Sequence, residues 1–454
     1  MELLSPIPSR MMETDTVRYN CTHKFTCTGR YTLNTLKSPK FTRQEKSWIL
    51  YDIANSAFIM VLTATIPIYF RSLTKDAGVS AQHSTSMWGT STSLALLILA
   101  FLSPILGALA DYRDMKKKIF GFFLAVGVGG GIAFTLAPGW ITFLVFFIVS
   151  RIGYSACNIF YDAMLIDVST DERMDKISSF GYAFGYIGSC IPFIIGILLI
   201  LTTPFGLSTI TATRISFFMT MVWWVLLSLP LFFNVHQVHY LEPRKDFVKH
   251  SFKRLTLVFL KLKKDRKLLY FIVGYFFYID GVYTIISMAT TYGSEVGIDS
   301  TQMILALLLT QFVAFPCAIL ASKLAGKFGT MKMIKVFIIM YSCICTFGYF
   351  LDTAVEFWIL AIAVGMCQGG IQALSRSQFG KMIPKKESTE YFGFFDIFGK
   401  FADFFGPLLL SLCAFFFHSS KYGVLSLILL FAIGYFLLHK SDRLMQAEKN
   451  VTQD

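Results

Sequence analysis

Long apolar stretches separated by short polar segments recur along the whole chain. Most have a length near the roughly 20 residues that an α-helix needs to cross a bilayer. The pattern predicts twelve membrane-spanning helices, at 48–70, 87–110, 119–137, 141–165, 178–201, 215–234, 268–291, 301–323, 332–350, 354–380, 391–417 and 422–439. We therefore expect an all-α polytopic membrane protein.

Composition supports this interpretation. Of the 454 residues, 55% are hydrophobic, only 15% are charged and 47 are Phe, whereas soluble domains contain about 25% charged residues. The sequence has no HExxH, GxSxG or paired-His motif, and the Gly-rich stretch 127–131 lies inside an apolar segment, where it indicates helix packing. The nine Cys have no metal-ligand spacing. We expect neither an enzyme nor a bound cofactor or metal.

The net charge of +13 follows the positive-inside pattern. Most Lys and Arg of the connections lie in the even-numbered ones between predicted helices. The opposite side carries four, namely Arg71, Lys75, Arg214 and Lys421. We therefore expect both termini in the cytoplasm and no nucleic-acid partner. The basic stretch 254–267 either lies on the bilayer surface or only sets the topology.

The chain contains an internal duplication. Residues 153–182 align without a gap onto residues 365–394, at a constant offset of 212, and Gly153 meets Gly365. The duplication predicts two six-helix halves. We expect a disordered cytoplasmic tail at 1–46, a first half at 47–234, a basic cytoplasmic linker at 235–267, a second half at 268–440 and a cytoplasmic tail at 441–454.

A motif between the second and third predicted helices, "GALADYRDMKKK" (107–118), resembles the gating signature of the major facilitator superfamily. Two six-helix halves joined by a basic loop are also similar to that architecture. Asp111 can pair with Arg113, or with a helix N-terminus across the interface between the halves, and so latch one conformation. In the second half the equivalent position is Gly326.

Longer stretches resemble the vacuole effluxer-like branch of that superfamily, namely "LYDIANSAF" (50–58), "YDAMLIDV" (161–168), "ISSFGYAFGYIGS" (177–189) and residues 369–407. The resemblance implies a secondary active or facilitative transporter that works by alternating access. Fungal members are credited with exporting amino acids from the vacuole, whereas most bacterial members have no assigned substrate. We expect amino-acid efflux, with proton coupling left open, in a cell membrane or, in a eukaryote, a vacuolar-type membrane.

Polar residues at helical spacing mark the helices that line the central cavity in this architecture, which are the first, fourth, seventh and tenth. Asp280 is our candidate for proton coupling, and Asp52 and Arg376 are expected to contact substrate or to close the cytoplasmic side. The two-pronged donors of Arg151 and Arg376 suit the carboxylate of a zwitterionic substrate. The candidate pathway residues are Asp52, Asn55, Arg151, Asn158, Asp162, Asp280, Tyr283, Gln368, Gln372 and Arg376.

Asp396, Lys400 and Asp403 follow i, i+4, i+7 spacing and share one face of the eleventh predicted helix. With Asp111 and Arg113 they form our candidate gating set, because a charged stripe there can join the halves in one state and release them in the next. Permanent structural pairing explains the stripe equally well.

Other readings of the transporter remain open. The solute can instead be sugar-like, a peptide or an organic cation, and the same fold also carries substrate sensors and lipid-moving proteins. We expect membrane lipid and a small-molecule substrate as partners, and a monomer.

Overall fold

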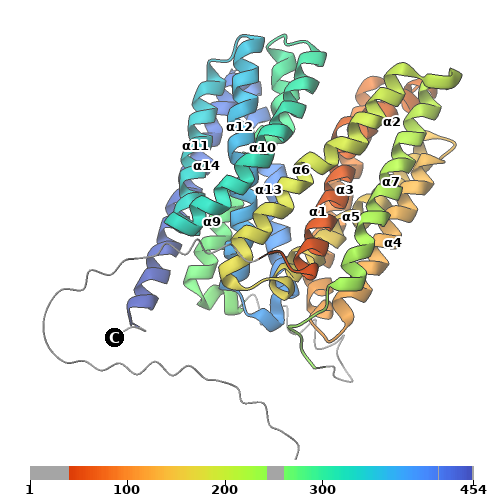
Figure 1. The fold of residues 1–454 in the computed structure, drawn as a ribbon. Coiled ribbons are helices and arrows are strands. Elements are labelled where there is room, and N and C mark those ends of the chain that lie inside the picture. Colours follow the sequence, from red (N-terminus) through yellow and green to blue (C-terminus); the bar gives the residue numbers. More distant parts are fainter. Residues whose placement is uncertain (1–39, 243–259, 418, 452–454) are drawn as a thin grey trace, which may run out of the picture. The chain divides into compact units, whose positions relative to one another are not determined.

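The structure is a computed structural model that describes residues 40–242, 260–417 and 419–451. The described residues from Phe41 to Val451 form one compact unit. The described chain is almost entirely helical (Figure 1). Its helices are α1 (Arg43–Ala64), α2 (Ile66–Asp76), α3 (Ala81–Ala110), α4 (Met115–Thr135), α5 (Trp140–Val168), α6 (Asp171–Thr202), α7 (Thr209–Asn234), α9 (Arg266–Glu295), α10 (Ser300–Phe328), α11 (Thr330–Tyr349), α12 (Ala354–Met382), α13 (Ser388–Phe417) and α14 (Ser420–Val451), with short 3-10 turns η1 (Pro204–Gly206) and η2 (Lys385–Glu387).

The twelve predicted spans are confirmed as helices. Each overlaps one of the long helices, except that α1 and α2 together form the first. Within the described residues, eleven helices are long and apolar enough to cross a bilayer. The remaining long helix, α13, carries the charges Asp396 and Lys400 and packs against α3, α9 and α14. The charged helix is thus held among other helices.

Some boundaries differ from the sequence-based ones. Thr42 caps α1 in a capping box with Glu45, so residues 43–46, predicted to belong to the tail, are helical. Likewise α14 continues through most of the predicted C-terminal tail. Residues 1–39, and 243–259 of the predicted linker, lie outside the described residues.

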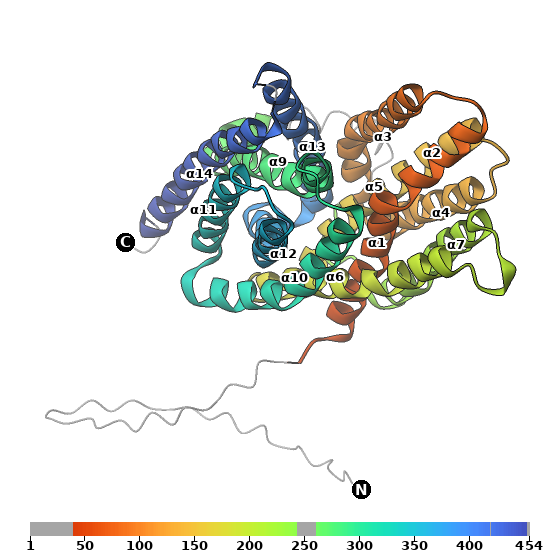
Figure 2. The same cartoon turned by 90° about the horizontal axis from the view of Figure 1, so that it is seen from above.

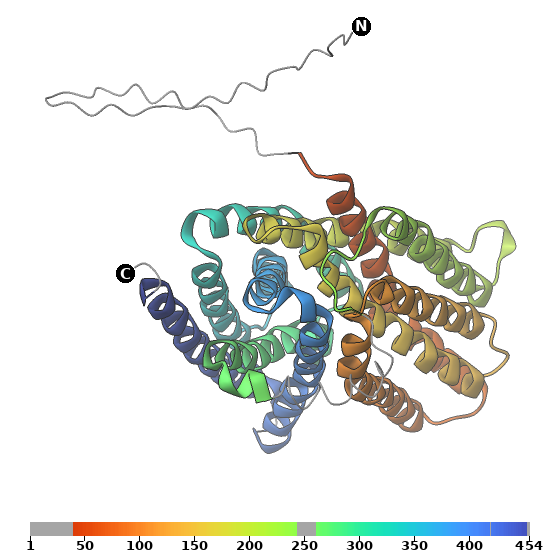
Figure 3. The same ribbon diagram turned by 90° about the horizontal axis from the view of Figure 1, so that it is seen from below.

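The two groups of helices, α1–α7 and α9–α14, meet along a defined set of pairs. Helix α6 packs against α10 and α12, while α3 and α5 pack against α13. Views along the helices show α3 beside α13 and α6 beside α10 (Figures 2 and 3). The charged residues described below lie on helices of both groups.

Glycines let the backbones of α3 and α13 come close together. A Cβ on Gly107 of α3 would overlap the backbone of Thr389 and Glu390, and one on Gly393 of α13 would lie 2.6 Å from the carbonyl oxygen of Ser103. Small residues permit such contact between membrane helices. As a result, the C-terminal end of α3 lies directly against the N-terminus of α13.

Candidate transport pathway

Arg376 on α12 joins the second group of helices to three helices of the first. Its Nη1 donates to Asp162 Oδ1 of α5 at 2.9 Å, and its Nη2 lies 3.3 Å from Asp52 Oδ2 of α1. Its Nε also donates to the hydroxyl of Ser178 on α6 at 2.9 Å. Three of the predicted pathway residues, from three different helices, therefore converge in one ionic cluster.

Aromatic rings surround this guanidinium. Its carbon atom lies 4.4 Å from the ring centre of Tyr182, 4.7 Å from that of Trp48 and 5.4 Å from that of Tyr161. Arg376 is only 3% exposed. Cation–π contact and two carboxylates compensate the buried charge. The sequence analysis missed Trp48 and Tyr182, although Trp48 lies one helical turn before Asp52 and so shares its face.

A second group of polar side chains lies farther along the same helices. Gln372 and Gln368 precede Arg376 by one and two turns of α12. The Nε2 of Gln368 donates to Gln311 Oε1 on α10 at 3.2 Å, and the Nε2 of Gln311 contacts the sulfur of Met60 on α1 at 3.0 Å. Gln311 was not predicted, because the eighth span was not expected to line the pathway.

Two further predicted residues lie on α5. Arg151 is buried, and its guanidinium lies 6.0 Å from the ring centre of Tyr154. Asn158 is half-buried between Arg151 and Asp162 along the helix. Asp162, Asn158 and Arg151 thus form a polar row on α5 that runs from the ionic cluster toward the middle of the predicted span.

Asp280 of α9 contacts the backbone of α13. Its fully buried carboxylate accepts a hydrogen bond of 2.7 Å from the backbone N–H of Gly406 on α13. Pro407 follows directly inside this helix. Tyr283 is half-buried one turn farther along α9. The structure therefore brings Asp280 to the backbone of α13, within the second group of helices.

The charged stripe on α13 contacts the first group of helices. Lys400 forms an ion pair with Asp396, and Asp396 Oδ2 accepts a hydrogen bond of 3.0 Å from Ser103 on α3. The side chain of Asp403 lies outside the described residues. Within the described part, internal pairing and a contact between the halves both occur, so gating by the stripe and permanent pairing both stay predictions.

Asp111 lies at the N-terminus of α13. Its Oδ1 accepts from the backbone N–H of Thr389 at 2.8 Å and its Oδ2 from that of Glu390 at 3.1 Å. A helix N-terminus has unsatisfied N–H groups and a partial positive charge, which suit a carboxylate. Arg113 instead lies over the ring of Tyr240 and near Asp114. Of the two predicted alternatives, the structure has the helix N-terminus.

The second half has Gly326 where the first half has Asp111. In the corresponding contact between the halves, the acid is Asp175, which also belongs to the first half. Asp175 of α6 forms an ion pair with Lys381 at 2.7 Å, and accepts hydrogen bonds from Ser377 at 2.6 Å and Thr330 at 2.7 Å. Asp175 and Lys381 lie in the two duplicated segments, and this was the sequence signal that could have pointed to them. The two related contacts therefore carry their acids on the same half of the chain.

The first residues of the linker are bonded to the segment that carries Asp111, between α3 and α4. Lys116 and Asp167 form a fully buried ion pair of 2.7 Å, and Asp167 Oδ1 accepts from the backbone N–H groups of Val238 and His239 at 3.0 Å each. Lys116 also donates to the hydroxyl of Ser388, the first residue of α13, at 3.3 Å. This end of the linker is thus bonded to the contact between the halves.

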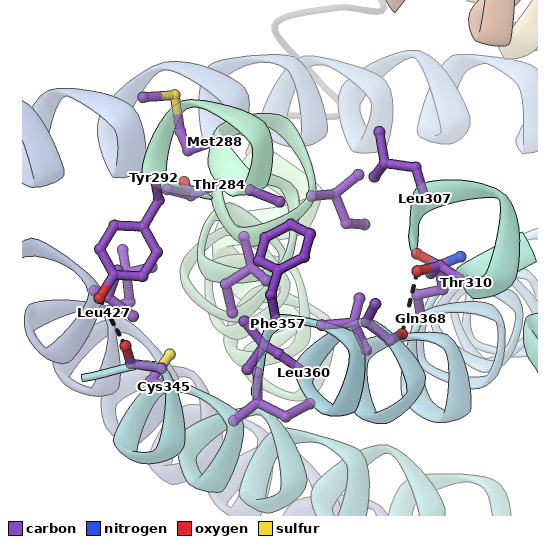
Figure 4. A pocket seen from close by; sticks show the side chains of 18 of the residues that line it. Thr284, Met288, Tyr292, Leu307, Thr310, Cys345, Phe357, Leu360, Gln368 and Leu427 are labelled. Atoms are coloured by element: carbon purple, nitrogen blue, oxygen red, sulfur yellow. Dashed lines mark hydrogen bonds between the residues drawn. The ribbon is translucent and has the colours of Figure 1, made fainter. Parts of the chain in front are cut away.

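An apolar pocket lies among α9–α14 (Figure 4). Its hydroxyl groups already donate to backbone carbonyls: Thr284 to Asp280, Thr310 to Ala361 and Tyr292 to Gly348. Among the described residues that line it, none carries a charge. A polar solute would find few partners there, and Gln368, at its wall, is its connection to the pathway.

Comparison with known proteins gives the family. The model of the family described as vacuole effluxer Atg22 like matches residues 42–167 and 166–449. The chain belongs to this family. It is 46% identical over 407 residues to an uncharacterized MFS-type transporter, YxiO, of Bacillus subtilis, covering 88% of this chain and 95% of that one. It is also 22% identical over 440 residues to autophagy-related protein 22 of Eremothecium gossypii, covering 83% and 86%.

Solved structures give the same fold. The human organic anion transporter MFSD10 matches with a TM-score of 0.65 at 14% identity, covering 87% of this chain and 99% of that one. The transporter FucP in its outward conformation matches with a TM-score of 0.66 at 14% identity, covering 88% and 97%. Together with the 46% identity to the MFS-type transporter YxiO, this fold makes the protein an integral membrane transporter of the major facilitator superfamily.

Proposed function

We propose that the protein exports an amino acid by alternating access, and that the Arg376 cluster both binds the solute and closes the cytoplasmic side. The observation that carries this proposal is the buried guanidinium of Arg376 between the carboxylates of Asp52 and Asp162, because it places opposite charges from both halves within 3.3 Å. The words "vacuole effluxer" in the family description agree with export.

The position of the bonds between the halves supports a closed cytoplasmic side. Asp111, Asp171 and Asp175 lie at helix ends that the positive-inside pattern assigns to the cytoplasm. Each bonds or pairs with a residue of the second half. Because alternating access rocks the halves about a central site, opening this side requires all these bonds to break together.

A zwitterion suits the cluster better than a simple cation or anion. Separating a buried ion pair so that one charge stays unpaired costs about 3–5 kcal/mol. An ammonium group at Asp162 and a carboxylate at Arg376 would compensate both charges at once. The side chain of Asp162 is 26% exposed and that of Asp52 only 6%, so Asp162 is the acid that a solute reaches first.

The test is flux of labelled amino acids through proteoliposomes. We expect Arg376→Gln to abolish flux and Arg376→Lys to retain only part of it, because an ammonium lacks the two-pronged donor geometry. Arg71→Gln is the matched control, since Arg71 is exposed and donates to Thr85 in the same half. Wild-type protein that carries no amino acid, or Arg376→Gln with wild-type flux, refutes the proposal.

A further inference from the structure

The halves touch at two levels along α1 and α12. The first is the ion pair between Asp52 and Arg376. The second is eight residues away on both helices, where Met60 contacts Gln311, which in turn holds Gln368. At 1.5 Å per residue, eight residues separate the levels by about 12 Å. That spacing suits one small solute whose ends point to the two levels.

The second level uses its hydrogen-bonding groups poorly. The donor Nε2 of Gln311 points at the sulfur of Met60, and a thioether is a weak acceptor. Because the Oε1 of Gln311 is held by Gln368, the amide is already oriented. An oxygen atom placed near Met60 would therefore be a better partner for this donor than the one it has.

Buried polar atoms near the two levels also support binding of a polar solute there. The Oδ1 of Asn55, one turn beyond Asp52, and the hydroxyl of Tyr186 are buried without a hydrogen-bond partner among the described residues. The ring of Tyr186 lies against Gly369, next to Gln368. Leaving such groups buried without a partner is unfavourable, so they favour a polar guest between the two levels.

We propose that Gln311, with Gln368, binds the side chain of the transported amino acid and selects an uncharged side chain that carries an oxygen acceptor, an amide above all. This inference rests on the proposed function, which puts the zwitterionic end at Arg376. The hydrogen bonds of Gln311 and Gln368 involve no charged group. A charged side chain would be buried there without compensation, and an aliphatic one would leave the amide donor unused.

Uptake of labelled glutamine and leucine into proteoliposomes tests the inference. We expect wild-type protein to prefer glutamine by kcat/KM, and Gln311→Leu to lower the glutamine-to-leucine ratio by roughly tenfold, the equivalent of one hydrogen bond. Leucine flux should persist, which separates lost recognition from lost folding. Gln302→Leu is the matched control on α10, because Gln302 bonds to Trp358 and is exposed.

The outcomes are distinct. Equal wild-type rates for glutamine and leucine, or an unchanged ratio in Gln311→Leu, overturn the role of Gln311. Flux of neither amino acid by wild-type protein overturns the proposed function itself, and this inference with it. If Gln311→Leu does not fold, Gln311→Asn takes its place, since its shorter amide should also lower the ratio, and a ratio equal to wild type has the same refuting meaning.

Discussion

Replacing Asp111 by Asn tests whether the contact at the N-terminus of α13 holds the two halves together. The carboxylate bonds to the N–H groups of Thr389 and Glu390 at 2.8 and 3.1 Å and is fully buried. An amide retains one acceptor oxygen but turns an NH₂ group toward the positive end of α13 and loses the charge. The variant therefore weakens only the state in which these groups meet.

The magnitude follows from the geometry. A charge at a partly buried helix end contributes up to about 2 kcal/mol. Because one acceptor remains in Asn, we expect a loss near this value rather than the larger sum of two charge-assisted bonds. A change of about 2 kcal/mol alters the ratio of the two conformations roughly thirtyfold. That is large enough to turn a minor open population into a visible one.

The assay is double electron–electron resonance between spin labels at Glu172→Cys and Lys386→Cys, in a background without native cysteines. Both positions are exposed and belong to opposite halves. We expect Asp111→Asn to add a population at longer distance, whereas Asp114→Asn, at a neighbouring 75%-exposed side chain, should leave the distribution as in wild type. Identical distributions for Asp111→Asn and wild type would refute the latch.

Three further variants probe the contacts around this latch. Lys116→Met should lower the melting temperature in detergent strongly, by the equivalent of about 3–5 kcal/mol, because it leaves the carboxylate of Asp167 buried without its ion pair. Adding Asp167→Asn should restore part of the loss, because it removes the unpaired charge and keeps an oxygen that accepts from the N–H groups of Val238 and His239; no recovery would contradict this reason. Gly393→Ala should lower the melting temperature by the equivalent of about 1–3 kcal/mol, since its Cβ overlaps the α3 backbone, while Gly129→Ala, with open space around it, should not. Asp175→Asn should add a long-distance population of its own in the resonance experiment, and the combination with the Asp111 variant should exceed either alone; a combined effect no larger than one single effect would mean that the two contacts are one unit.

The spans were predictable because a bilayer imposes a length and a composition on every crossing helix. The halves followed from the duplication. Residues such as Arg376 were predictable as well, because a charge at membrane depth needs a partner inside the bundle. The partners themselves were not, since the bond from Arg376 to Asp162 joins residues 214 positions apart, and periodicity only says which face a residue occupies.

Residues that bond to backbone were the hardest to anticipate. Asp280 stays our candidate for proton coupling, but its carboxylate accepts from the N–H of Gly406, and no side-chain pattern marks a backbone group as a partner. Gln311 escaped attention because it lies in the eighth predicted span, which was not expected to line the pathway. Lys116 was not singled out because it lies among basic residues that the topology already explained, and no pattern paired it with Asp167, 51 positions away. In each case the three-dimensional neighbour, and not the residue type, defines the role.

The bonds between the halves at the predicted cytoplasmic end differ in their exposure to water. Exposed and buried bonds should therefore respond differently to salt. The ion pair of Lys385 with Asp171 is exposed on the side of Asp171, so dissolved ions weaken it, whereas the buried carboxylate of Asp111 is shielded from ions. Added salt should consequently slow the approach of the two halves more than it loosens them once joined. Rim charges of this kind guide encounter, and buried ones set its lifetime.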